Sequence, residues 1–261
     1  MSFDFPAVLV LATLVTGVIW AADAMFFAKC RAAQASGGET KEPVAVEWSR
    51  SFFPVIFVVL ILRSFVAEPF RIPSGSMMPT LLVGDFILVN KFSYGLRLPV
   101  ADTKVIELGS PKRGDVVVFR YPKNPSIDYI KRVVGIPGDK VGYFNKQLYI
   151  NGNPIKQKSK GVYIGDGAGA EMTGASLRDE SLEGVEHEIL VVPDSNGMEG
   201  EIVVPKGQYF VMGDNRDRSN DSRYWGTVSD KHLVGKAFFI WMNWDWNGGG
   251  VQWQRIGSSI D

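Results

Sequence analysis

The sequence predicts a mainly β protein, in which two N-terminal transmembrane helices precede an external, mostly antiparallel β-sheet domain with an inserted smaller β-rich subdomain. Three observations predict this fold class. Apolar residues form two long runs near the N-terminus of the 261-residue chain. Short runs rich in β-branched and aromatic residues follow from residue 68 onward, separated by turn signals. A stretch rich in Gly, Glu and Ser, residues 154–205, then interrupts these strand-like runs.

The first apolar run covers residues 5–27, and Asp23 is its one charged residue. A helix of about 20 such residues crosses a bilayer. A cleaved signal peptide is the competing interpretation, but residues 1–4 lack the positive charge that usually begins one. We therefore assign residues 1–28 to a first transmembrane span.

The second apolar run begins at residue 52 and reaches membrane length only if Arg63 extends its charged end to the interface. We assign residues 51–67 to this second span and residues 29–50 to a connector. The connector contains lysines and arginines, whereas the N-terminal tail has none, so the positive-inside rule predicts that the connector is cytoplasmic. The rest of the chain then lies on the export side of the membrane.

The body of the chain has an all-β pattern. Turn signals such as Pro137-Gly138-Asp139 and Asn151-Gly152 separate the runs that we expect to form strands. These runs are residues 86–89, 115–121, 128–136, 147–150, 208–212 and 233–242. We expect residues 68–153 and 206–261 to form the main β domain, with 154–205 as an inserted subdomain that carries no chemistry.

Composition excludes several functional classes. The 28 basic residues balance the 28 acidic ones, so no net field favours nucleic acid as a partner. Cys30 is the one cysteine, which excludes an intramolecular disulfide. The two histidines, His187 and His232, are far apart in the sequence, so we expect no zinc site. We expect no other metal and no cofactor either.

The motifs of other serine hydrolases also fit poorly. His187 falls in the insertion and His232 in a polar turn, and the sequence contains neither a G-x-S-x-G elbow nor an S-x-x-K motif. A tight turn with two serines remains, directly after the second span. It reads Pro73-Ser74-Gly75-Ser76-Met77-Met78-Pro79-Thr80-Leu81, and Gly75 allows close backbone approach within it.

This turn resembles the nucleophile box of bacterial type I signal peptidases. Three further strings resemble the later boxes of that family, in the same order: residues 113–119, 128–139 and 213–226. The resemblance extends from the spans to the C-terminal region, except for the insertion. It implies a membrane-bound serine endopeptidase that removes N-terminal signal peptides from exported preproteins after a small-x-small site.

The resemblance assigns the nucleophile to Ser76 and the general base to Lys131. Strand alternation agrees, because it places Lys131 on one face with Tyr129 and turns Arg132 to the other. With its ordinary pKa of about 10.4, a lysine amine would almost always be protonated at pH 7. We therefore expect burial among apolar neighbours to lower the pKa of Lys131.

The resemblance also implies roles for other residues of the boxes. Ser219 would orient the lysine amine, and the hydroxyl of Ser74 would join the Ser76 backbone N–H in stabilising the oxyanion. The supporting residues are Tyr129 and two ion pairs, Arg132 with Asp214 and Asp221 with Arg223. Two apolar pockets for small side chains would be lined by Ile72, Met77, Leu81, Ile87, Tyr129 and Ile130.

By family analogy, two spans and an external domain fit a multi-pass protein of a Gram-negative inner membrane with its catalytic domain on the periplasmic side; an organellar relative stays open. The expected partners are preprotein signal peptides and the lipid bilayer, and the export translocon is left open. Two alternatives are also left open: a Ser/Lys peptidase that cleaves itself or a regulatory partner, and a non-catalytic export scaffold.

Overall fold

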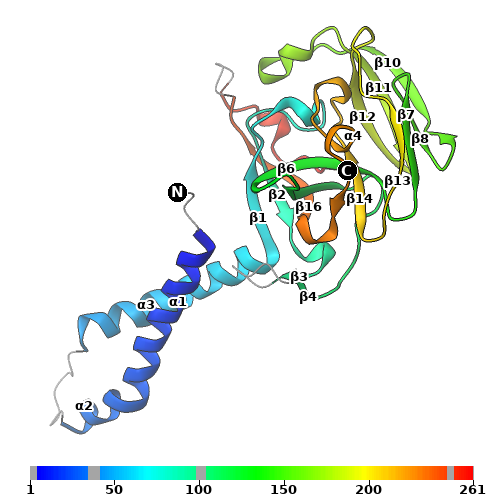
Figure 1. The fold of residues 1–261 in the computed structure, drawn as a ribbon. Helices are drawn as coiled ribbons and strands as arrows, with labels where there is room; N and C mark the ends of the chain where they lie inside the picture. The colour runs from blue at the N-terminus through cyan, green and yellow to red at the C-terminus, as the bar shows by residue number, and fades with distance from the viewer. Residues whose placement is uncertain (1–4, 35–41, 98–103, 246–249, 261) are drawn as a thin grey trace. The chain divides into compact units, whose positions relative to one another are not determined.

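The structure is a computed structural model that describes residues 5–34, 42–97, 104–245 and 250–260 (Figure 1). The chain divides into two compact units. The first comprises Met1–Ala67 and Leu96–Ile106, and the second comprises Glu68–Gly95 and Glu107–Asp261. Helices dominate the first unit and strands dominate the second, as the sequence predicts.

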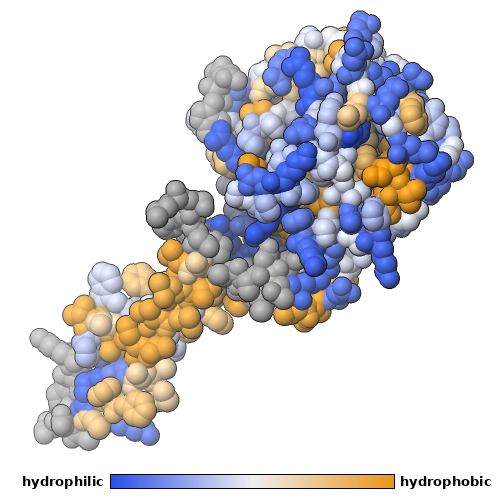
Figure 2. Space-filling model, viewed as in Figure 1, coloured by the Kyte–Doolittle hydropathy of each residue, from blue (hydrophilic) through white to orange (hydrophobic). Residues whose placement is uncertain are grey.

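The first unit contains two long apolar helical segments with mean hydropathies of 2.0 and 1.8, at Ala7–Arg31 and Val44–Ser64. Most of their large apolar side chains are exposed, which suits a lipid environment (Figure 2). The elements are α1 (Phe5–Ala22), π-helical η1 (Asp23–Phe27), α2 (Ala28–Gln34), α3 (Val44–Ile61), π-helical η2 (Leu62–Val66) and the strands β3 (Leu96–Arg97) and β4 (Lys104–Ile106).

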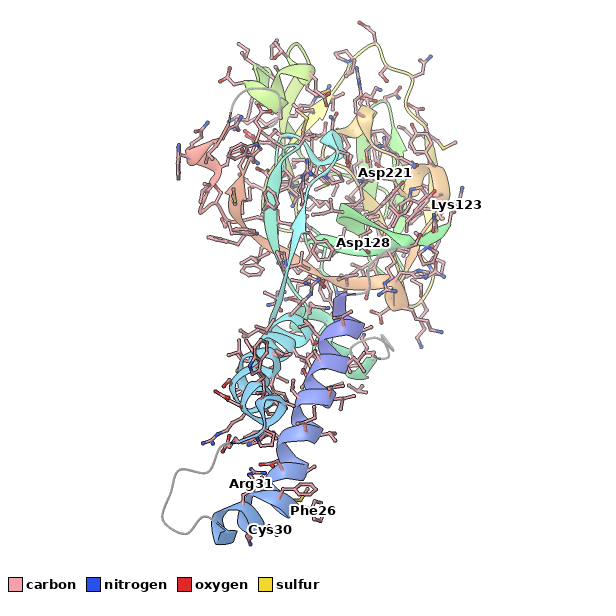
Figure 3. All side chains as sticks on the ribbon, turned by 90° about the vertical axis from the view of Figure 1, so that its left-hand side faces the viewer. Phe26, Cys30, Arg31, Lys123, Asp128 and Asp221 are labelled. Carbon is pink, nitrogen blue, oxygen red and sulfur yellow. The ribbon has the colours of Figure 1, made fainter. Side chains whose placement is uncertain are left out.

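Helices α1 and α3 pack against each other through small and aromatic side chains. The ring centroids of Trp20 and Phe53 lie 5.5 Å apart. Gly17 permits this approach, because a Cβ atom there would lie 2.8 Å from the Phe53 ring. Arg31 lies near the end of the first helical segment (Figure 3) and pairs with Asp23, with 2.6 Å between Nη2 and Oδ2. The charge inside the first span is thus neutralised within the same segment.

A seven-stranded sheet forms the centre of the second unit, in the order β1-β2-β16-β5-β6-β14-β15. The strand pairs from β2 to β15 are antiparallel, which confirms the predicted fold class. The strands are β1 (Ala67–Arg71), β2 (Asp85–Asn90), β5 (Val116–Tyr121), β6 (Asn124–Gly135), β14 (Gln208–Met212), β15 (Val228–Ser229) and β16 (Leu233–Asn243).

Two smaller sheets accompany the central one. The first, in the order β13-β7-β8-β9, consists of β7 (Lys140–Phe144), β8 (Gln147–Ile150), β9 (Asn153–Pro154) and β13 (Gly200–Val203). The second, in the order β10-β11-β12, consists of β10 (Gln157–Val162), β11 (Ser176–Leu182) and β12 (Val185–Val191). Strand β13 pairs with β7, so the end of the inserted region returns to a strand that precedes the insertion.

Short helical turns connect these strands. They are the 3-10 helices η3 (Gly75–Met77), η4 (Phe92–Tyr94), η5 (Gly167–Met172), η6 (Arg216–Arg218), η7 (Asp230–His232) and η8 (Trp253–Arg255), and the one-turn helix α4 (Ser222–Trp225). Helix η3 carries Ser76, and η6 lies just before Ser219. Both turns contribute to the site described below.

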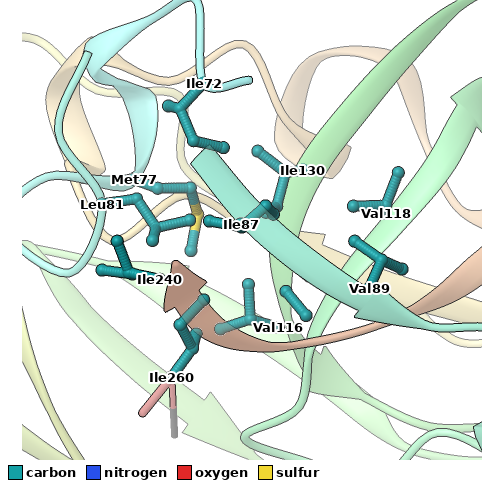
Figure 4. Close-up of a cluster of buried hydrophobic side chains, with 11 residues drawn as sticks. Ile72, Met77, Leu81, Ile87, Val89, Val116, Val118, Ile130, Ile240 and Ile260 are labelled. Atoms are coloured by element: carbon teal, nitrogen blue, oxygen red, sulfur yellow. The ribbon is translucent and has the colours of Figure 1, made fainter. Parts of the chain in front are cut away.

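The main hydrophobic cluster lies beneath the turn that follows β1 (Figure 4). Side chains alternate in β2, so Ile87 and Val89 are fully buried, whereas Phe86 and Leu88 between them are only partly buried. Met77 and Leu81 add two fully buried side chains from the turn itself. The turn with the two serines is therefore fixed to the sheet by its own apolar residues.

Candidate active site

The turn of residues 73–81, which we call the nucleophile turn after the box that it resembles, lies between β1 and β2, and η3 is its one helical element. Met78 is fully buried, whereas Ser76 keeps 8% exposure. Gly75 is in close contact with its surroundings: a Cβ atom there would lie 2.7 Å from Glu171 Oε1 and 2.9 Å from Met78 Sδ. The backbone before Ser76 is thus packed closely against its surroundings.

Strand β6 brings Lys131 to this turn. The Lys131 Nζ atom lies 2.6 Å from Ser76 Oγ and 2.8 Å from the carbonyl oxygen of Ile130. The ring centroid of Tyr129, on the same face of β6, is 5.4 Å from Nζ. The structure therefore brings together two residues that are 55 positions apart in the sequence.

Burial lowers the pKa of the Lys131 amine from its ordinary value of 10.5 to about 8, although Asp221 and Asp214 partly oppose this by raising it. The side chain keeps only 3% exposure, and removal from water disfavours the ammonium form. At pH 7, a lysine with a pKa of about 8 is neutral about 9% of the time, compared with about 0.03% at the ordinary value. A neutral amine beside a serine hydroxyl can act as a general base.

Ser74 lies beside the nucleophile turn's second serine, with 3.4 Å between the Ser74 and Ser76 hydroxyl oxygens. At this distance, the Ser74 hydroxyl can donate to an oxygen atom bound close to Ser76. Ser74 is exposed, in contrast to buried Ser76. The two hydroxyls are therefore neighbours, and Ser74 lies on the solvent side of the pair.

Ser219 is buried close to the same turn, but it does not bond to Lys131 in this structure. Its Oγ atom has no hydrogen-bond partner among the described residues. Gly213 separates it from the nucleophile turn, because a Cβ atom on Gly213 would overlap both Ser219 Oγ and the carbonyl oxygen of Ser76. The orienting role expected for Ser219 thus stays a prediction.

Two buried ion pairs support the site. Arg132 Nε and Nη2 lie 2.9 and 2.8 Å from the two Asp214 oxygens, and the Thr80 hydroxyl donates to Asp214 over 2.6 Å. Burial alone would raise the pKa of Asp214, but Arg132 and Thr80 lower it below its usual range. One carboxylate therefore connects the nucleophile turn, the lysine strand and the last box.

The second ion pair joins Asp221 to Arg223, with Nε and Nη2 each 2.8 Å from a carboxylate oxygen. Asp221 lies inside the β-rich unit (Figure 3) and also accepts a 3.0 Å hydrogen bond from the Gly213 N–H. This bond fixes the segment that touches Ser76. The expected pairings of both arginines are therefore present in the structure.

The residues expected to line the substrate pockets are brought together, but mostly inside the core. Ile72, Met77, Leu81, Ile87 and Ile130 belong to one buried cluster, with exposures of 8% or less (Figure 4). Tyr129 is partly buried and stacks on Tyr121, with 4.4 Å between ring centroids. The cluster thus forms a packed floor beneath Ser76.

Sequence reasoning assigned no role to Thr80 or Asn215. Asn215 donates twice to the nucleophile turn: its backbone N–H to the Ser76 carbonyl over 3.1 Å, and its Nδ2 to the Gly75 carbonyl over 3.0 Å. Both residues lie within boxes that the sequence analysis recognised, but nothing in their spacing indicated these contacts.

Among the described residues, no group of three or more His, Cys, Asp or Glu side chains could hold a metal ion.

The family model for signal peptidases of peptidase family S26 matches residues 45–244. The chain belongs to this family. Signal peptidase I of Pseudomonas fluorescens is 50% identical, and that of Pseudomonas aeruginosa is 49% identical, each over 94% of both chains. Signal peptidase I of Haemophilus influenzae is 33% identical over 92% of this chain and 86% of its own length. As a signal peptidase, the protein is a membrane-bound serine peptidase that removes signal peptides from preproteins.

Proposed function

We propose that the protein cleaves preproteins after a small-x-small site, with Ser76 as nucleophile and neutral Lys131 as general base. The observation that carries this proposal is the 2.6 Å contact between Lys131 Nζ and Ser76 Oγ. Burial supports it, because it lowers the pKa of this lysine to about 8. Lysine therefore supplies the base that histidine supplies in other serine peptidases.

The reaction begins when Lys131 takes the hydroxyl proton of Ser76 and Oγ attacks the scissile carbonyl carbon. The oxyanion receives hydrogen bonds from the Ser76 N–H and the Ser74 hydroxyl. The Lys131 ammonium then gives its proton to the departing amine, which leaves an acyl-enzyme. Water hydrolyses this ester, with Lys131 again as the base. The buried Ser219 Oγ, which has no partner among the described residues, is the candidate acceptor for the ammonium.

Small residues are selected because the pocket floor is already filled. Met77, Leu81 and Ile87 are fully buried in a packed core, so a large substrate side chain could enter there only if the core repacked. Ile72, Ile130 and Tyr129 border the same region. Small-x-small sites are also what signal peptides offer near the outer membrane face.

The catalytic unit acts on the export side of the membrane. This orientation rests on the basic residues of the connector, which the positive-inside rule assigns to the cytoplasm. Both helical segments then cross the bilayer, and residues from 68 onward face the side where signal peptides emerge. We propose a bacterial inner membrane with a periplasmic catalytic domain.

Cleavage of a purified preprotein in detergent tests the dyad. We expect Ser76→Ala and Lys131→Met each to abolish detectable cleavage while the protein stays folded, because each removes one half of the proton-transfer pair. Lys160→Met is the matched control, since Lys160 is an exposed lysine of the insertion. Cleavage at the wild-type rate by either dyad variant would refute its assignment.

The alternatives give different results in the same assay. A peptidase that cleaves itself would yield fragments when incubated alone, whereas we expect the wild type to remain intact. A non-catalytic scaffold would support export equally well with Ser76→Ala. We expect that variant to leave preproteins uncleaved in cells.

A further inference from the structure

The loop from Gly213 to Asn220 lies between two parts of the second unit. On one side it touches the nucleophile turn, and on the other the inserted hairpin formed by β11 and β12. Within the loop, the only regular element is the single turn of η6, among the described residues. The loop therefore depends on its neighbours for its position.

Asn215 fixes both peptide groups that flank Ser76. The Gly75 carbonyl, which accepts from Asn215 Nδ2, belongs to the same planar peptide as the Ser76 N–H. The Ser76 carbonyl, which accepts from the Asn215 N–H, belongs to the next peptide. The Met78 N–H also donates to the Gly75 carbonyl, over 3.2 Å. The direction of the Ser76 N–H, the proposed oxyanion donor, is thus set by an amide from another part of the chain.

The inserted hairpin fixes Asn215 from the opposite side. The Leu190 N–H donates to the Asp214 carbonyl over 2.9 Å, and Leu190 forms a parallel β-bridge with Asn215. Val192 N–H donates to the Asp217 carboxylate over 2.8 Å. These contacts, which use backbone N–H groups of the insertion, hold Asp214 and Asp217 on either side of Asn215.

A buried ion pair completes this support. Arg216 Nη1 lies 2.9 Å from Glu180 Oε2, and Nη2 bonds to the other carboxylate oxygen. Glu180 and Arg216 have exposures of 0% and 1%, so neither charge has access to water as a substitute. His187 lies opposite Glu180 in the hairpin, with 3.4 Å between Nε2 and Oε1. Separation of the loop from the hairpin would leave a buried charge unpaired.

We propose that Asn215 is a positioning residue for the Ser76 N–H, and that Glu180 of the inserted hairpin holds it in place through Arg216. This inference rests on the proposed Ser76 mechanism. It gives the insertion a part in catalysis, in contrast to the expectation from sequence. The oxyanion donor must be aligned in advance of the reaction, so a small displacement of the turn is costly in rate.

Steady-state cleavage of a preprotein by the full chain in detergent tests this inference. We expect Asn215→Ala and Glu180→Gln each to lower kcat about 10- to 100-fold. KM should be unchanged, because the pocket floor is untouched. The acidic limb of the pH profile should also keep its midpoint, because neither residue contributes to the pKa of Lys131.

The matched control is Asp139→Asn. Asp139 is 4% exposed and accepts a 2.8 Å hydrogen bond from Arg113 Nε, so it is also a buried carboxylate paired with arginine. It has no bond to the Gly213–Asn220 loop or the nucleophile turn. We expect Asp139→Asn to lower the unfolding temperature while kcat stays at the wild-type value.

The double variant Glu180→Gln/Asn215→Ala separates coupling from general damage. If Glu180 acts through Asn215, the double variant should lose no more kcat than the more impaired single variant. Multiplied losses, or an equal loss in Asp139→Asn, would overturn the inference. Wild-type kcat in Asn215→Ala would overturn it even if Glu180→Gln failed to fold. Failure of the proposed function is distinguishable, because wild-type protein would then not cleave the preprotein at all.

Discussion

Lys131 illustrates how one residue obtains its chemistry from its surroundings. Burial is the main cause of its lowered pKa, and no neighbouring cation is among the causes. Two carboxylates act in the opposite direction and raise the pKa. Asp214 and Asp221 are largely neutralised by Arg132 and Arg223, which bond to them directly. The arginines thus protect the lysine from charges that would otherwise raise its pKa further. A lysine in water would almost always be protonated at pH 7 and so could rarely accept a proton.

The activity should therefore depend on pH through Lys131. In the proposed mechanism the neutral amine is the active form, so kcat/KM should rise with pH and level off above about pH 8, the pKa of the buried lysine. Well below this value, each unit of pH should lower kcat/KM about tenfold. A rate profile measured from pH 5 to 10 checks this. An acidic limb centred near the ordinary lysine value would contradict the burial argument.

At the scale of elements, a polar side chain joins the nucleophile turn to the sheet, in addition to the buried methionines of the turn. The Thr80 hydroxyl reaches the same Asp214 oxygen that accepts from Arg132 Nη2. Arg132 lies on β6 next to Lys131, so the bond aligns the serine segment with the lysine strand. The geometry of the dyad depends on three segments that are far apart in sequence.

Thr80→Val should weaken this connection. The replacement preserves shape but removes the donor to a buried carboxylate, a change that costs about 1.5–3 kcal/mol in free energy of unfolding. Thr80→Ser keeps the hydroxyl and should be close to wild type. Thermal unfolding in detergent measures the stability of both variants, and their cleavage rates are measured alongside. Equal stability of Thr80→Val and Thr80→Ser would show that the hydrogen bond contributes nothing.

At the scale of the whole molecule, membrane attachment and catalysis belong to different compact units. The helical unit exposes apolar side chains along both long segments, whereas the β-rich unit contains buried core clusters, although it also exposes apolar side chains such as Ile164 and Trp253. This division lets lipid stabilise one unit and water the other. The orientation in the membrane can therefore be tested separately from the catalytic mechanism.

Cys30 offers a direct test of this orientation, because it is the one cysteine and is exposed. In intact spheroplasts, a thiol reagent that cannot cross membranes should leave Cys30 unlabelled, and should label it after the membrane is permeabilised. Cys30→Ser/Ser159→Cys provides the control, because Ser159 is exposed on the insertion and should label without permeabilisation. Labelling of Cys30 from outside would reverse the proposed topology.

The sequence predicted more of the fold than of the site. The six expected strands match β2, β5, β6, β8, β14 and β16, and the expected strands at β5 and β6 each extend one residue beyond the observed strand, because alternating apolar residues and turn signals are local properties of the chain. The sequence predicted a β-rich insertion but not the positions of its strands, because β10 and β11 are largely polar and β13 forms by pairing with β7. Pairing between distant segments leaves no local pattern.

The sequence by itself determined the class of the protein: two apolar segments, a β-rich body, and boxes in an order that indicates a serine/lysine peptidase. The tertiary structure alone decided the 2.6 Å approach of Lys131 to Ser76, the burial that lowers the lysine pKa, and the hold of Asn215 on the nucleophile turn. Periodicity and motifs are properties of the local sequence. The distance between two catalytic side chains and their removal from water depend on how remote segments pack together.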